Sequence, residues 1–242
     1  MPGVEVFVGG NSAIFLDFLH VTDSYQWIVL AVVLGLSFLL LMVVFRSLIL
    51  PIKAILMNLL SVAAAYGAVT LVFQKGVGIN FFNSLGFHFH QSEAIEAWLP
   101  LFLFSILFGL SMDYQVFLIS RIREEYDKSG DNSEAVAFGL RTTGGIITGA
   151  AIIMVAVFAA FASGRIAGLQ QMGFGLAIAV FLDATIVRSI LVPSAMKLLG
   201  DRNWYLPGWL QWLPKLNVEG AAEEQEPVLL PQAEPVGVRD DA

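Results

Sequence analysis

The chain has 242 residues, of which 57% are hydrophobic and 14% are charged, and its mean hydropathy is +0.76. A soluble domain is about half apolar and a quarter charged, so this composition excludes an ordinary soluble domain and predicts an all-α membrane protein. The net charge of −7 comes mostly from an acidic C-terminal stretch. The absence of cysteine excludes a disulfide framework and a thiolate metal site, and no basic stripe interleaved with aromatics indicates a nucleic-acid partner.

Five segments are long and apolar enough to cross a bilayer, since a spanning helix needs about 20 such residues. They lie at about residues 27–45, 54–73, 98–120, 146–163 and 172–191. We therefore predict a five-helix transmembrane bundle within residues 27–200. No cleavable signal peptide is predicted before it, because residues 1–26 contain Glu5, Asp17 and Asp23 and lack a basic leader.

The flanking segments have their own patterns. Residues 1–26 contain a strand-like stretch at 4–8, a Gly9-Gly10 turn and a short amphipathic helix around 13–19, which is typical of the end of a preceding segment. Residues 201–216 are rich in Trp and Pro, which predicts a position at the membrane interface. Residues 217–242 are acidic and contain proline, which predicts a disordered cytoplasmic tail.

Positive charge predicts the orientation of the spans. If the N-terminus is outside, 11 of the 13 Lys and Arg residues fall on the cytoplasmic side, and only Lys75 and Arg165 fall outside. We therefore expect a multi-pass protein of the cell (plasma or inner) membrane, with its N-terminus outside and its C-terminus in the cytoplasm. Such a start, without a signal peptide, predicts a further crossing upstream.

Asp113 is the strongest functional candidate, because a carboxylate within an apolar span is costly and is expected to face protein or a water-filled cavity. The alternative is a protonated Asp that only hydrogen-bonds a neighbouring helix. Tyr114 follows at once, about 100° around the helix, so it is better placed to serve a carboxylate on a facing helix than its own neighbour. A packing tyrosine is the alternative for Tyr114.

The face of the helix that carries Asp113 is predicted to be a contact or channel surface. Steps of three and four place five residues on it, namely Ile106, Gly109, Leu110, Asp113 and Phe117. Gly109 permits the close approach of another helix. On the pattern alone, this is a packing stripe that gains interest from Asp113.

Asp183 lies near the middle of the last span and is a possible second polar site. It could bind a proton or serve as a partner for polar groups on the fourth span, such as Thr148. Arg188 lies five residues on, about 140° around an α-helix, so an ion pair within the helix is not expected. We expect Arg188 to extend to the inner surface instead.

Other motifs carry less information. Gly145 and Gly149, and Gly164 and Gly168, match the G-x-x-x-G packing pattern, which is weak in a glycine-rich membrane chain. His88 and His90 form an H-x-H on the loop between the second and third spans, but no third ligand is obvious and an ordinary loop is favoured. We predict no metal site and no cofactor.

Four stretches carry a resemblance to a known family: VFVGGNSAIFLDF at 6–18, FRSLILPIKAILMNLLSVAAAYG at 45–67, FGLSMDYQVFLISRIREEY at 108–126 and FLDATIVRSILVPSAMKLLG at 181–200. Residues 142–161 also fit. The chain resembles, over about residues 4–215, the C-terminal transmembrane half of the MMPL family of exporters in the RND superfamily. In that family each half has six crossings, with a large extracytoplasmic porter domain after the first.

The resemblance implies several functional expectations. Residues 1–26 would be an extracytoplasmic remnant of a porter domain. Asp113 and Tyr114 would match the second Asp-Tyr pair of the proton relay, and Gly109, Leu110 and Phe117 would match positions that line the central channel. The implied function is proton-motive-force-driven export of lipid or other hydrophobic solutes. The implied partners are protons, the solute, and either the N-terminal transporter half or a second copy of the chain.

Three alternatives stay open from the sequence. The chain could be a sterol-sensing-like regulatory or accessory membrane subunit, or a truncated fragment without function alone. Catalysis by an intramembrane aspartyl protease is disfavoured, because that chemistry calls for Tyr before Asp in one helix and G-x-G-D in the next. Here Tyr114 follows Asp113, and Phe181-Leu182 precede Asp183. We therefore predict that the chain is not an enzyme.

Overall fold

The structure, a computed structural model, describes residues 9–210 and residue 212. The predicted strand at residues 4–8 and the acidic tail at 217–242 lie outside the described residues. The helices are α1 Asn11–Phe45, α2 Ile49–Val69, η1 Thr70–Gln74, α3 Ile79–Ser84, α4 Leu99–Ser129, α5 Asn132–Ala162, α6 Ala167–Leu182, η2 Asp183–Leu191, α7 Val192–Leu199, η3 Gly200–Trp204 and η4 Gly208–Leu210. The η1 and η2 segments are π-helical, and η3 and η4 are 3₁₀-helical.

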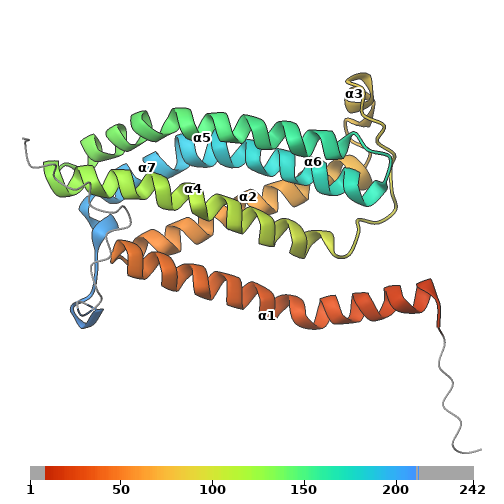
Figure 1. Cartoon of the computed structure of the whole chain (residues 1–242), viewed down its shortest axis with the longest axis horizontal. Coiled ribbons are helices and arrows are strands. Elements are labelled where there is room, and N and C mark those ends of the chain that lie inside the picture. The colour runs from red at the N-terminus through yellow and green to blue at the C-terminus, as the bar shows by residue number, and fades with distance from the viewer. Residues whose placement is uncertain (1–8, 211, 213–242) are drawn as a thin grey trace, which may run out of the picture.

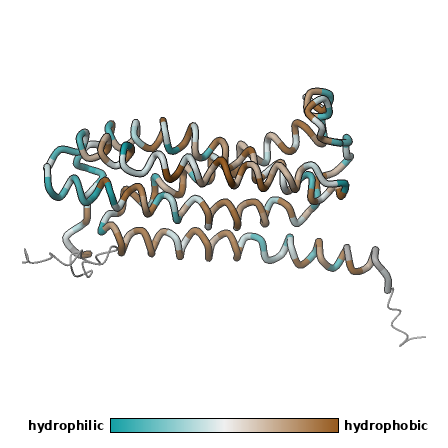
Figure 2. Tube along the Cα trace, turned by 45° about the horizontal axis from the view of Figure 1, so that its top comes forward, coloured by the Kyte–Doolittle hydropathy of each residue, from teal (hydrophilic) through white to brown (hydrophobic). Residues whose placement is uncertain are grey.

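Five of these helical runs are long and apolar enough to cross a membrane, which confirms the predicted all-α bundle. They span Leu16–Phe45, Ile49–Gln74, Leu99–Ser129, Asn132–Ala162 and Ala167–Trp204. Many of their large apolar side chains point outward; Leu36, Leu56 and Ile153 are each more than 60% exposed. Figure 2 shows hydrophobic residues along the middle of the bundle and hydrophilic residues gathered towards its two ends. This pattern fits a bilayer as the surrounding solvent.

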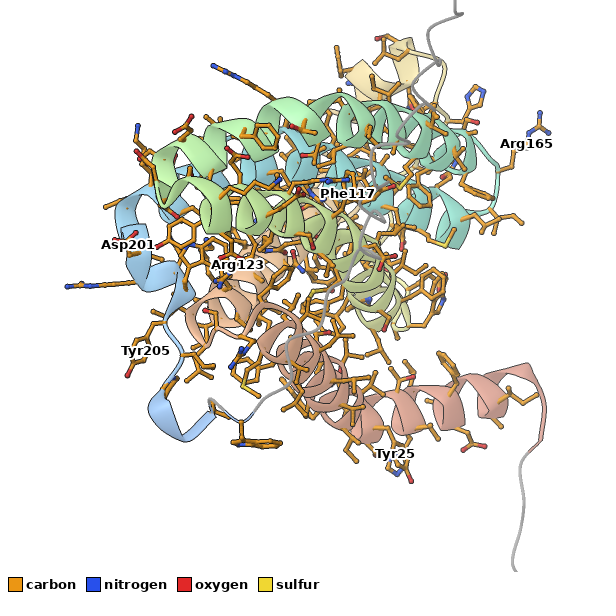
Figure 3. The ribbon with its side chains drawn as sticks, turned by 60° about the vertical axis from the view of Figure 1, so that its left-hand side comes forward. Tyr25, Phe117, Arg123, Arg165, Asp201 and Tyr205 are labelled. Atoms are coloured by element: carbon orange, nitrogen blue, oxygen red, sulfur yellow. The ribbon has the colours of Figure 1, made fainter. Side chains whose placement is uncertain are left out.

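The five runs alternate in direction, so the bundle has two distinct ends (Figure 1). We call the end with α3 and the turn between α5 and α6 the loop end, and the end with η3 and the turn between α4 and α5 the strap end. Figure 3 places Arg165 at the loop end and Asp201 and Tyr205 at the strap end. At the strap end, Asn203 contacts the start of α2, where its backbone oxygen accepts a hydrogen bond from Ser47 Oγ at 2.6 Å.

Helix α1 is continuous, whereas we predicted a short helix at 13–19 and a separate span from residue 27. No proline or glycine interrupts residues 11–34, so the helix passes through Asp17 and Asp23 without a break. Only the C-terminal part of α1 packs on the bundle, through the buried residues Leu41 and Phe45. Its N-terminal part extends away from the other helices, and Tyr25 lies on this extension (Figures 1 and 3).

Two apolar clusters form the core, one towards each end. The loop-end cluster includes Phe73, Phe89, Leu103, Phe174 and Leu176, and the strap-end cluster includes Leu41, Leu118, Ile122, Val187 and Met196. The helices pack most closely where glycine replaces a side chain. A Cβ on Gly173 of α6 would lie 2.5 Å from the backbone nitrogen of Ala162 in α5.

The predicted G-x-x-x-G pattern at Gly145 and Gly149 is not used inside this bundle. A Cβ at either glycine would meet no atom within 4 Å. These two positions therefore face away from the described helices, while the close contact between α5 and α6 depends on Gly173, which belongs to neither predicted motif.

Candidate functional site

A set of buried polar side chains lies between the two apolar clusters. They are Asn58 and Ser61 of α2, Ser111 and Gln115 of α4, and Asp183 and Arg188 of η2. Ser111 lies 12 residues beyond Leu99, or about 18 Å along α4 at 1.5 Å per residue. Since the apolar core of a bilayer is about 30 Å thick, this polar cluster lies deep within the membrane-spanning part of the bundle.

The centre of the cluster is an ion pair between Asp183 and Arg188. Arg188 Nη2 and Nε donate to Asp183 Oδ2 at 2.7 Å and 2.8 Å, and both residues are 6% exposed. A buried pair of this kind persists only when its remaining polar atoms also find partners. The polar groups of α2 and α4 supply some of them.

The prediction that Arg188 would not pair with Asp183 was wrong, and the reason is the local helix type. Asp183–Leu191 is π-helical, so its hydrogen bonds join residues five apart instead of four apart. This geometry brings residues five apart onto one face, whereas an α-helix separates them by about 140°. The prediction assumed an unbroken α-helix.

Ser111 connects the ion pair to α2 and α4. Its hydroxyl oxygen lies 2.7 Å from Asn58 Oδ1 and 3.1 Å from Asp183 Oδ2, so its single proton can serve either acceptor. Arg188 Nη2 lies 2.9 Å from the backbone oxygen of Ser111. Ser61 Oγ lies 3.5 Å from Asp183 Oδ1. Three helices are thereby joined through one carboxylate and one guanidinium.

Tyr114 lies against the same cluster. The Arg188 guanidinium carbon is 5.0 Å from the centroid of the Tyr114 ring, within the range of a cation–π contact. The Tyr114 hydroxyl lies 3.8 Å from Met154 Sδ in α5. Tyr114 is half-buried. Its side chain therefore extends from α4 towards α5 and η2.

Asp113 lies in a different environment from its neighbour. Its side chain is exposed, and it makes no hydrogen bond or ion pair with any residue of the described part of the chain. Adjacent helical residues point about 100° apart, which is why Tyr114 enters the bundle while Asp113 faces away from it. At this depth an exposed carboxylate on an isolated helix costs about 2.5–3.5 kcal/mol on the lenient insertion scale.

The five residues of the predicted stripe on α4 differ in how far they are exposed. Gly109 is exposed, and a Cβ there would meet no atom within 4 Å. Ile106 and Phe117 are half-buried. Leu110 is also half-buried and, with Tyr114, Met154, Asp183 and Arg188, lines a small pocket between α4, α5 and the last run. The most outward line of α4 runs through Phe102, Ser105, Gly109 and Asp113.

Besides Arg188 of its own segment, Asp183 takes hydrogen-bond partners from α2 and α4. Thr148, which we named as a possible partner, is exposed on α5. Sequence reasoning missed Ser61 and Ser111 as contacts of Asp183, and Asn58 as a contact of Ser111. A search for polar residues within apolar spans would have found all three, but their convergence depends on how the helices pack.

The H-x-H motif lies on the surface of the loop end. His88 and His90 are exposed on either side of the buried Phe89. Asn83 holds this segment by accepting from the Phe89 backbone nitrogen at 2.8 Å and donating to the Phe89 oxygen at 3.2 Å. In the part of the chain that the structure describes, no group of three or more His, Cys, Asp or Glu side chains is placed to hold a metal ion.

Comparison with known proteins shows which sequences the chain is similar to. The chain is 42% identical over 206 residues to the "Heme uptake protein MmpL11" of Mycobacterium tuberculosis, and the match covers 85% of the chain and 21% of the relative. It is 39% identical over 219 residues to "Membrane protein YdfJ" of Bacillus subtilis, covering 90% of the chain and 30% of the relative. It is 37% identical over 209 residues to the "Trehalose monomycolate exporter MmpL3" of Mycolicibacterium smegmatis, covering 86% of the chain and 20% of the relative.

The chain thus spans less than a third of the length of these relatives. A family model, described as "MMPL family", matches residues 1–212, a range that includes all five long helices and every residue of the polar cluster. The chain therefore belongs to the MMPL family.

Proposed function

We propose that the chain forms part of a proton-driven transporter that exports a lipid or another hydrophobic solute. One observation carries the proposal: Asp113 lies deep in a spanning helix, exposed and without a partner among the described residues. A carboxylate retained in so costly a place is a functional candidate by default. A carboxyl group that faces away from its own bundle can take up and release a proton at an interface with another body.

Tyr114 suits the role of a reciprocal partner. It is too far around the helix to serve Asp113 of the same chain, and among the described residues its hydroxyl bonds to a thioether, which is a weak acceptor. In an assembly, this hydroxyl could donate to a carboxylate of a facing body, while Asp113 accepts from a group on that body. We propose Asp113 and Tyr114 as the two relay residues supplied by this chain.

The facing body is proposed to be the N-terminal half of an MMPL transporter or a second copy of this chain. Phe102, Ser105, Gly109 and Asp113 form the outward line of α4 and have the mixture of aromatic, small and polar residues that membrane helix interfaces use. The line lacks the continuous large apolar surface that lipid favours. Ile106, Gly109 and Phe117 would then border the channel between the two bodies, and Leu110 would lie just behind them.

The cargo and the orientation belong to the same proposal. One relative is named for export of trehalose monomycolate and another for uptake of heme, and both names are compatible with a large apolar or amphiphilic solute. The positive-charge bias favours the strap end as cytoplasmic, because Lys53, Arg121, Arg123, Lys197 and Arg202 lie towards that end. The loop end and the extension of α1 would then lie outside.

The test replaces Asp113 by Asn in the complete transporter assembly, reconstituted in vesicles with an imposed proton gradient. Asn keeps the shape of a protonated carboxyl but cannot release a proton, so gradient-driven lipid transport should fall to background while insertion is unchanged. Asp127→Asn is the matched control, since Asp127 is exposed on the same helix beyond its apolar part and pairs with Arg123 at the surface. Normal transport by Asp113→Asn would remove Asp113 from the mechanism.

A further inference from the structure

We propose that Arg188 is a positioning residue for Tyr114, and that the π-helical segment Asp183–Leu191 is a two-register element that sets the position of Arg188. The importance of this element for transport rests on the proposed function, in which Tyr114 belongs to the relay. Its two helical registers do not depend on that function and can be measured separately.

The π register is supported by three independent contacts. The Val192 backbone nitrogen donates to the oxygen of Val187, five residues back. Ser189 Oγ donates to the oxygen of Ala184 at 2.9 Å, again five residues back. The side chains of Asp183 and Arg188, also five apart, form the buried ion pair. Since π-helical turns are rare and occur often at functional sites, a register held by a buried charge pair calls for a functional explanation.

The segment has room to change register. Its inner face consists of the buried residues Asp183, Val187 and Arg188, whereas Thr185, Ile186, Ser189 and Ile190 are exposed. No other described helix covers that outer face. A return to α-helix would separate Asp183 and Arg188 by about 140° around the axis, so the pair and the α register exclude each other.

Arg188 connects this register to the relay helix. In the π form its guanidinium lies over the Tyr114 ring at 5.0 Å and donates to the backbone oxygen of Ser111 at 2.9 Å. In the α form it would be carried away from both contacts. Tyr114 would then lose the cation that fixes its ring, and its hydroxyl would be free to turn towards the interface. The register therefore controls which way Tyr114 points.

The charge on Asp183 is the natural determinant of the register. The groups bonded to its carboxylate are Ser61 of α2, Ser111 of α4 and Arg188 of its own segment; Asn58 bonds to Ser111, and Tyr114 lines the same pocket. Arg188 is the only charged partner among them. Neutralising Asp183 leaves hydrogen bonds but removes the charge attraction, so the segment should return to the more stable α register.

Electron paramagnetic resonance can read the register in membranes, because the chain contains no cysteine. Cysteines that replace the exposed residues Thr185 and Ile190 would carry a nitroxide pair five residues apart. Ile152 and Val157, also exposed and five apart but in the regular α-helix α5, give the reference pair. We expect clear dipolar broadening for the pair at 185 and 190, and markedly less broadening for the pair at 152 and 157.

Asp183→Asn and Arg188→Gln, each introduced into the pair at 185 and 190, should reduce the broadening to the level of the α5 reference. Arg188→Lys, which keeps the charge, should retain part of it. Equal broadening of the two label pairs in the parent chain would show that the π register is absent in membranes. Unchanged broadening in both neutral variants would show that the ion pair does not hold it. Either result would overturn the proposal.

Transport measurements in the complete assembly then test the positioning role. Arg188→Gln should reduce gradient-driven transport at least tenfold and alter its pH profile, with partial rescue by Arg188→Lys. If Arg188→Gln changed the helical register without any loss of transport, the positioning role of Arg188 would be refuted. If Asp113→Asn also transported normally, the proposed relay would fail, while the register change recorded by the spin labels would stand as a property of the bundle.

Discussion

The buried ion pair between Asp183 and Arg188 gives the sharpest energetic prediction. Both side chains are almost fully enclosed, so removing one partner leaves an uncompensated charge inside the bundle. Breaking a buried pair in this way costs about 3–5 kcal/mol in soluble proteins. A lone charge at mid-membrane costs about 2.5–3.5 kcal/mol on the insertion scale. We therefore expect Asp183→Asn and Arg188→Gln each to lower the free energy of unfolding by about 3 kcal/mol.

The double variant Asp183→Asn/Arg188→Gln should cost less than the sum of the two single variants. With both charges gone, no uncompensated charge is left inside the bundle, and the segment can adopt the α register. Interacting pairs give coupling energies of about 0.5–3 kcal/mol, and a pair as enclosed as this one should fall in the upper half of that range. The parent chain, the two single variants and the double variant form a double-mutant cycle. Their free energies of unfolding can be measured by reversible unfolding in mixed micelles of increasing SDS fraction, with helix content as the signal.

The surface pair Arg123 and Asp127 on α4, with side chains 35% and 57% exposed, provides the control cycle; the partners lie four positions apart and are 3.0 Å from each other. Solvent-exposed helix pairs of this type contribute about 0.3–0.5 kcal/mol. Equal coupling energies for the two pairs would contradict the view that burial makes the difference. Additive costs for Asp183→Asn and Arg188→Gln would show that the two residues do not act as a pair at all.

Two further predictions concern the assembly and its orientation. Ser105 lies on the outward line of α4, so a cysteine at this position should cross-link in membranes to a second copy or to another MMPL half. Leu107 is buried, so Leu107→Cys should not cross-link. A monomeric particle without a cross-link at position 105 would argue against the interface. A reporter inserted after Leu85, at the exposed tip of the loop end, should be extracytoplasmic, and a reporter fused after residue 215 should be cytoplasmic. If both reporters lay on the same side of the membrane, an odd number of crossings between them would be ruled out.

Hydropathy was sufficient to predict the five-helix bundle. Each crossing is a long apolar run, and lipid permits only structures that satisfy their own backbone hydrogen bonds. The same signal misplaced the start of α1, because Asp17, His20 and Asp23 lower the local hydropathy without breaking the helix. Helix continuity depends on backbone propensity, whereas hydropathy reports only which part of a helix lies in lipid.

The polar cluster was only partly predictable, and the reason is geometric. Asp183 and Arg188 were each recognisable as intramembrane charges, but their pairing depends on a π-helical turn that no hydropathy or periodicity pattern marks. Ser111 was also visible as a hydroxyl in an apolar span. Its position between Asn58 and Asp183 follows from how three helices pack, which is a property of the tertiary structure.

Asp183 and Asp113 both place a carboxyl group, which is costly there, within the spanning part of the bundle, but their surroundings differ. Asp183 is enclosed, paired with Arg188 and bonded by groups from α2 and α4. Asp113 lies on a helix of the same bundle, yet it has no described partner and faces outward. Because lipid provides no hydrogen-bond donor, we propose that a polar group from another body covers the carboxyl group of Asp113. This outward carboxyl group, next to a tyrosine that Arg188 of the enclosed pair contacts, is the reason why we propose proton coupling at Asp113.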